Sequence, residues 1–166
     1  MRYYLALFAI AVFSNANSQV KKRYPKTLIY CGSYSFGSNV KRGSVGSLVV
    51  YPETDSTILF YFEGSRGAPS YNMGQLYGRM KIINGKGLYF SFVLDSAKPC
   101  QFSCEFKSNQ VLIKTVDEKG NCGFGFGVYI DGVYKRDTRN VPTYFEDETG
   151  SRVYFKKTLP ENWNSP

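Results

Sequence analysis

The stretch GQLYGRMKIINGKGLYFSFVL, residues 74–94, contains two runs of alternating side chains joined by Asn84-Gly85. Alternation with a period of two is typical of a β-strand that buries one face. Asn-Gly between two such runs favours a two-residue hairpin turn, because both residues tolerate a positive φ angle. We expect these side chains to point inward: Leu76, Gly78, Met80 and Ile82 from the first run, and Leu88, Phe90, Phe92 and Leu94 from the second.

Similar strand signals recur along the chain after residue 26, and helical periodicity is nowhere sustained. Turn-forming residues separate the runs. The predicted strands are residues 27–36, 45–51, 57–62, 74–83, 87–94, 100–107, 110–116 and 122–134.

Short connections between these eight strands predict an all-β fold, an antiparallel meander that closes into a barrel without free edges. A two-sheet β-sandwich is the alternative. Closure of the barrel would place residues 31–34 beside residues 131–134. A further hairpin, residues 141–145 and 152–157, and a tail that holds the only tryptophan, Trp163, are expected to pack on the barrel.

The last predicted strand contains the motif Gly123-Phe124-Gly125-Phe126-Gly127. A phosphate-binding glycine loop must end a strand and open a helix, whereas here the strand pattern continues to Tyr134. We therefore interpret the glycines as structural, permitting close approach of the backbone or of a ring. The inward set would be Cys122, Phe124, Phe126, Val128 and Ile130.

The N-terminus has the order of a secretory signal peptide: Arg2, then an apolar stretch over residues 3–13, then small and polar residues. Cleavage is expected after Ala16 or Ser18. The apolar stretch is shorter than the roughly 20 residues that a membrane-spanning helix needs. The predicted organisation is a signal peptide at 1–18, a basic lead-in at 19–26, a β-barrel at 27–136, and a C-terminal hairpin and tail at 137–166, with the mature protein in the periplasm or outside the cell.

Four cysteines follow the predicted signal peptide, and an even number in an exported chain favours two disulfides. Three pairings are possible. In an eight-stranded meander the sixth and eighth strands begin at the same end, which favours Cys100 with Cys122 and leaves Cys31 with Cys104. The chain contains no histidine, and the cysteine spacing does not suggest zinc. We predict neither a metal site nor a cofactor.

The chain has 21 basic and 13 acidic residues, a net charge of +8, and loss of Arg2 with the signal peptide leaves +7. Such a charge suits an acidic protein or an anionic glycan or lipid surface. The basic residues are scattered in small groups, so binding to nucleic acid is not expected. No later segment is apolar enough to cross a membrane.

The absence of histidine removes the commonest general base of enzymes. A glycan hydrolase needs only two carboxylates, and Glu63, Asp95, Glu105 and Asp131 lie on or beside predicted strands. Their positions at turns, strand ends and the polar face indicate structural or solvated roles, so we predict that the protein is not an enzyme. Tyrosines on outward faces, basic neighbours and the loop at residues 64–71 suggest a binding surface instead. The candidate residues are Arg66, Tyr77, Arg79, Lys81, Tyr89, Tyr129 and Arg136.

The chain resembles the small exported bacterial β-barrels that include the periplasmic lysozyme inhibitors and calycin-like proteins. The resemblance covers residues 27–136 and rests on an early Gly-x-Tyr (Gly32 to Tyr34), cysteines in the sixth and eighth strands, and a closing Asp-Gly-x-Tyr (Asp131 to Tyr134). It implies a non-catalytic inhibitor or envelope-guarding role. The Ser-Gly-x-x-Tyr inhibitory loop is missing, and an inhibitor of basic lysozymes should be acidic. No inhibitory residues are therefore transferred.

We therefore expect a secreted or periplasmic binding or inhibitor protein that recognises a protein or an anionic envelope polymer. The alternatives are a barrel that carries a small apolar ligand and a carboxylate-dependent glycan hydrolase.

Overall fold

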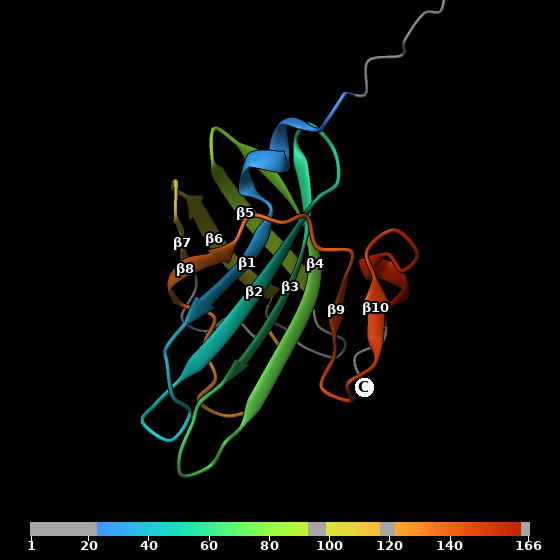
Figure 1. Ribbon diagram of the computed structural model, residues 1–166. Coiled ribbons are helices and arrows are strands. Elements are labelled where there is room, and N and C mark those ends of the chain that lie inside the picture. The colour runs from blue at the N-terminus through green and yellow to red at the C-terminus, as the bar shows by residue number, and fades with distance from the viewer. Residues whose placement is uncertain (1–22, 93–98, 117–121, 164–166) are drawn as a thin grey trace, which may run out of the picture.

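The computed structural model describes residues 23–92, 99–116 and 122–163, and within them the chain forms a closed antiparallel barrel with strand order β1 to β8 (Figure 1). The predicted barrel is confirmed and the β-sandwich is wrong. The predicted signal peptide lies outside the described residues. The barrel strands are β1 (Gly32–Phe36), β2 (Val45–Pro52), β3 (Thr57–Ser65), β4 (Met73–Ile83), β5 (Lys86–Phe92), β6 (Pro99–Phe106), β7 (Gln110–Thr115) and β8 (Gly132–Thr138).

The chain enters the barrel through a short 3-10 helix, η1 (Lys26–Tyr30), where the sequence predicted the start of a strand. Local contacts explain the difference. The backbone N–H of Lys26 donates to Asp55 Oδ1 at 3.0 Å, and the Thr27 hydroxyl donates to the Thr54 carbonyl. These bonds hold η1 on the turn between β2 and β3, so the first strand begins only at Gly32.

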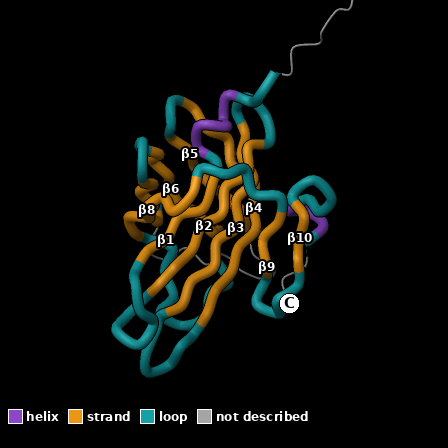
Figure 2. The backbone as a smooth tube through the Cα atoms, viewed as in Figure 1, coloured by secondary structure: helices purple, strands orange, loops and turns teal. Residues whose placement is uncertain are grey.

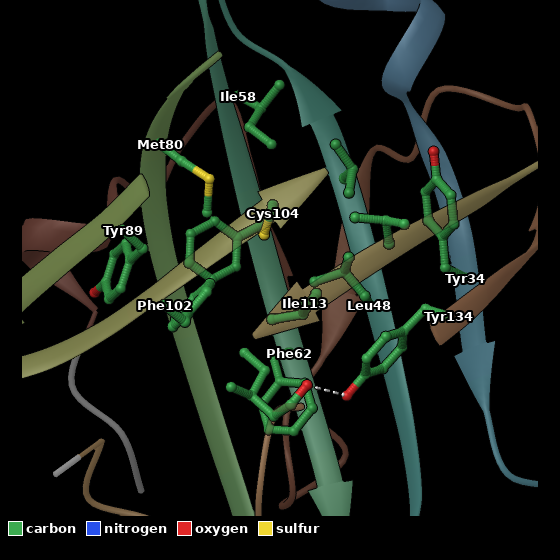
Figure 3. Packing of buried hydrophobic residues seen from close by; sticks show 14 of the residues in the cluster. Tyr34, Leu48, Ile58, Phe62, Met80, Tyr89, Phe102, Cys104, Ile113 and Tyr134 are labelled. Atoms are coloured by element: carbon green, nitrogen blue, oxygen red, sulfur yellow. Dashed lines mark hydrogen bonds between the residues drawn. The ribbon is translucent and has the colours of Figure 1, made fainter. Parts of the chain in front are cut away.

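The barrel interior is filled by aromatic and branched side chains (Figure 3). Phe60 makes edge contacts with Tyr89 and Phe102, at centroid distances of 5.1 and 5.8 Å. Tyr134 is fully buried, and its hydroxyl donates to the Ile130 carbonyl at 2.8 Å. A polar tyrosine tip is tolerated in the core because it has this partner.

The inward face of β5 is the opposite of the predicted one. Tyr89 is buried, whereas Leu88, Phe90 and Phe92 are exposed; Leu94 lies outside the described residues. The turn sets this phase, because directly opposed residues share a face of a sheet. Leu88 lies opposite the outward Lys81, so it must point outward as well.

The last barrel strand is shorter than predicted and begins at Gly132. Residues 122–131 form a loop, here named the glycine loop. Gly123 and Gly127 have φ angles of 74° and 77°, which extended strands do not allow. Their freedom from a Cβ permits the reversals that end the strand pattern. β8 then closes the barrel, with Tyr34 of β1 opposite Arg136.

The C-terminal segment forms the predicted hairpin, from β9 (Tyr144–Glu146) and β10 (Arg152–Tyr154), which lies beside the barrel wall (Figures 1 and 2). A short 3-10 helix, η2 (Pro160–Asn162), follows it. The hairpin covers outward residues of β3 and β4 and forms a second apolar cluster. Tyr61 stacks on Phe145 with centroids 3.9 Å apart.

Of the two predicted disulfides, Cys100–Cys122 is present and Cys31–Cys104 is wrong. Cys31 lies where η1 joins β1, and its Sγ is 3.4 Å from the Arg139 carbonyl oxygen. Cys104 lies within β6, and β7 and β8 separate β6 from β1. The path from β6 to β1 crosses three interstrand spacings of about 4.8 Å each. Their sum is well beyond the roughly 7 Å that a disulfide spans between Cα atoms. Both free thiols are buried.

Candidate binding surfaces

Most of the predicted binding residues have structural roles. Tyr89 lies in the core. Tyr77 lies under the C-terminal hairpin, and its hydroxyl donates to the Thr158 carbonyl at 2.8 Å. Sequence periodicity placed Tyr77 correctly on the outer face but gave no sign that the hairpin would cover it.

Two predicted basic residues are also held by the fold. The Arg79 guanidinium donates to Glu53 at 2.9 Å and to Glu161. These two bonds connect β4 to the β2–β3 turn and to η2. Arg136 donates to the Ile29 carbonyl at 3.1 Å, and its Cζ lies 4.9 Å from the centroid of the Tyr34 ring. Lys81 remains exposed on the outer face of β4.

Two predicted residues, Arg66 and Tyr129, lie at one end of the barrel. This end, which we call the loop end, carries the loop between β1 and β2 and the loop between β3 and β4. Tyr129 is 74% exposed on the glycine loop. Phe126, on the same loop, is 82% exposed and lies over Arg66, with 5.4 Å between the guanidinium carbon and the ring centroid. The sequence placed Phe126 in the core, because the glycine loop was predicted to be a strand.

The glycine loop is fixed to the barrel at several points. The Cys100–Cys122 disulfide holds its start. The Asn72 side-chain amide donates to the Phe126 carbonyl at 2.7 Å, and the Gly125 N–H donates to the Met73 carbonyl at 2.9 Å. Phe126 and Tyr129 therefore lie on a loop whose backbone is attached to the barrel, and such attachment lowers the entropic cost of ordering the loop on binding.

A second apolar surface runs along β5. Leu88, Phe90 and Phe92 are 54%, 54% and 64% exposed on one outward face, and we name this set the apolar stripe. The Phe90 and Phe92 rings touch edge to face, with centroids 5.3 Å apart. Single exposed apolar residues are ordinary, but a contiguous row of large ones is typical of an interaction surface.

Neighbouring strands leave the apolar stripe uncovered. β4 pairs with β5 only over Lys81–Ile83 and Lys86–Leu88, so no β4 residue lies directly opposite Phe90 or Phe92. On the other side the opposed residues are Ser103, Gln101 and Pro99 of β6.

The remaining predicted carboxylates do not converge. Asp131 accepts hydrogen bonds from the backbone N–H and the hydroxyl of Thr115, which explains it as a structural residue. Glu105 lies on the outer face of β6, and Asp95 is outside the described residues. Glu63 of β3 is half-buried, and burial together with the nearby Glu148 carboxylate raises its pKa.

Within the described ranges no group of three or more His, Cys, Asp or Glu side chains has the geometry of a metal site. No helix among these residues has the length and apolar character needed to cross a membrane.

Comparison with known proteins identifies no relative: no family model, no curated protein sequence and no solved structure matches the chain.

Proposed function

We propose that the protein is a non-catalytic binding protein, secreted or periplasmic, that recognises an acidic partner protein through the apolar stripe. The exposure of Leu88, Phe90 and Phe92 on one outer face is the observation that carries this proposal. Burial of apolar surface is the main favourable term in protein association. A partner that contributes apolar side chains suits this surface better than a polyanionic polymer does.

The charge around the stripe supports an acidic partner. Lys81 lies opposite Leu88, and Lys86 begins the same strand; both are exposed. The chain as a whole has a net charge of +8. Complementary charge accelerates association and selects among partners, so binding should weaken as the salt concentration rises.

The filled interior and the scattered carboxylates support surface recognition over the two alternatives, a small-ligand carrier and a glycan hydrolase. Large aromatic side chains occupy the interior in the place that a carried ligand would need. The similarity to the lysozyme-inhibitor barrels stays a prediction from the sequence, and it agrees with an inhibitory role for such a binding protein.

The test is capture of exported proteins of the source organism by the immobilised wild-type protein and by a Phe90→Ser, Phe92→Ser double variant. Both side chains are exposed, so the variant should keep the near-UV circular dichroism of the folded barrel. We expect the wild type to retain an acidic protein, and the double variant to capture at least tenfold less of it. Val133→Ser, at an exposed apolar position on β8, is the matched control and should retain the partner.

Two results would contradict the proposal. One is an identical set of captured proteins from the wild type and the double variant. The other is a wild-type dimer in light scattering that the double variant converts to monomer, because the stripe would then bind a second copy of this chain.

A further inference from the structure

A groove of about 580 Å³ crosses the barrel near the loop end, on a part of the wall distinct from the apolar stripe. Its lining includes outward side chains of β1, β2 and β3 and residues of the two loops that connect β1 to β2 and β3 to β4. The proposed recognition of a partner protein does not use it.

Polar side chains cross the floor of this groove in one row. Ser35 lies directly opposite Ser47, and Ser47 lies directly opposite Glu63. Directly opposed residues share a face, so two hydroxyls and a carboxyl lie side by side. The Ser35 hydroxyl donates to Asp137 Oδ1 at 2.8 Å, which leaves its oxygen as an acceptor for a ligand. Neighbouring strands are about 4.8 Å apart, a spacing close to the length of one pyranose ring.

A second row, two residues along each strand, is more apolar. Val45 lies opposite Ser65, and Ser65 lies opposite Met73. Tyr71 stands beside this row and is exposed, and it has a φ angle of 52°, which is rare for an aromatic residue. Hydrogen bonds on either side hold the loop, from the Tyr71 N–H to Gly67 and from the Arg66 N–H to Asn72. These bonds hold the Tyr71 backbone beside the groove.

Glu63 carries the strongest indication of a ligand. Its carboxyl group is half-buried, and no hydrogen bond or ion pair to it occurs among the described residues. Its oxygens keep some contact with solvent, because Glu63 is absent from the buried side-chain atoms that lack a partner among the described residues. The hydroxyl groups of a ligand would replace the water that this carboxyl binds in the free protein.

We propose that this groove binds a linear, neutral oligosaccharide. Serine hydroxyls and a carboxyl group match the donors and acceptors of sugar hydroxyls. Tyr71 and Met73 offer an apolar surface to the C–H faces of the sugar rings, as aromatic side chains do in ligand pockets. The Glu63 and Glu148 carboxylates repel an anionic chain, so the groove selects against the polyanions that the net charge of the protein would otherwise attract.

The test is calorimetric titration of the full chain with three probes: cellohexaose, chitohexaose and hexagalacturonate. We expect at least one neutral probe to bind and the anionic probe to bind at least tenfold more weakly. Ser47→Val should weaken binding about tenfold, which is the value of one lost hydrogen bond. Tyr71→Gly, which suits the positive φ angle, should weaken it by a similar factor.

Ser103→Val is the matched control, since Ser103 is also an outward serine, on β6 and outside the groove. It should leave the affinity unchanged. The Phe90→Ser, Phe92→Ser variant should also bind the sugar normally, so failure of the stripe and failure of the groove are separate results. Absence of binding by both neutral probes, preference for hexagalacturonate, or affinity insensitive to Ser47→Val and Tyr71→Gly would each overturn the proposal.

Discussion

The two cysteines outside the disulfide show how strongly position controls the chemistry of a single side chain. Cys31 and Cys104 are both almost completely buried. Burial raises the pKa of the Cys104 thiol to about 12, and desolvation also raises the pKa of Cys31 despite the nearby Arg136. Only the thiolate is nucleophilic, so at neutral pH neither group holds much of the reactive form.

We therefore predict that the native, oxidised protein does not react with a chromogenic disulfide reagent at pH 8, whereas two thiols react after unfolding in urea. Mass spectrometry of the alkylated, unfolded chain should locate both labels, at Cys31 and Cys104. Rapid labelling of either residue in the native state, or a second disulfide in the intact mass, would contradict the structure.

The same scale shows where sequence periodicity stops being sufficient. Alternation correctly indicated that Leu88, Tyr89 and Phe90 belong to a strand, but a run with large apolar residues at both phases does not reveal which phase faces the core. The Asn84-Gly85 turn decides the phase through the pairing of Lys81 with Leu88. A two-residue turn and the inward face of β4 together predict that Tyr89 points inward. The hydrophobicity of β5 alone favoured Leu88 and Phe90 instead.

At the scale of elements, the glycine loop joins the disulfide to the exposed rings of Phe126 and Tyr129. Cys100 and Cys122 are 22 residues apart in sequence, and a covalent link over such a segment stabilises mainly by restricting the unfolded chain. The loop contributes Phe124 to the barrel interior, where its ring lies 5.2 Å from that of Phe62. Loss of the disulfide should therefore affect both stability and the order of this loop.

We predict that the Cys100→Ala, Cys122→Ala double variant folds but loses about 2–4 kcal/mol of unfolding free energy. Urea denaturation followed by circular dichroism measures this loss. Amide exchange should accelerate most at Gly125 and Val128, whose N–H groups are bonded in the native loop. The Cys104→Ala variant removes a buried sulfur without cutting a bridge, so it should leave exchange in the loop unchanged. A free-energy change below about 1 kcal/mol in the double variant would show that the disulfide does not constrain the unfolded chain.

The elements that the sequence predicted best are β4 and β7, whose predicted bounds 74–83 and 110–116 differ by one residue from the observed Met73–Ile83 and Gln110–Thr115. The glycine loop was missed because Phe124, Phe126 and Val128 alternate with glycines as strand residues would. Contacts with residues distant in sequence hold this loop: the Gly125 N–H donates to the Met73 carbonyl, and Gly127, with its positive φ angle, lies against the Arg66 side chain. The alternation of residue types within residues 122–131 gives no information about such long-range contacts.

At the scale of the whole molecule, the barrel and the C-terminal segment form one packed unit. The outward side chains of Leu59, Tyr61 and Tyr77 are buried because the hairpin covers them. Phe155 stacks on Tyr51 with centroids 5.2 Å apart, which extends the contact to β2. The sequence predicted the hairpin and its packing on the barrel, but not the strands that it covers, because outward tyrosines are compatible with solvent exposure.

Trp163 provides a probe of this arrangement, because it is the only tryptophan in the chain and it packs on Tyr61, Tyr77 and Phe145. If the C-terminal segment is part of the cooperative unit, Trp163 fluorescence and far-UV circular dichroism should give the same urea midpoint and the same slope. We predict coincident transitions in the wild type.

Phe145→Ala removes a buried ring that touches both the hairpin and the barrel. It should lower the unfolding free energy by about 3–5 kcal/mol and shift the urea midpoints of both signals by the same amount. Thr143→Ala, at an exposed residue just before β9, is the control and should change stability by less than about 1 kcal/mol. A fluorescence transition that precedes the circular dichroism transition would mean that the hairpin and tail detach from a barrel that remains folded.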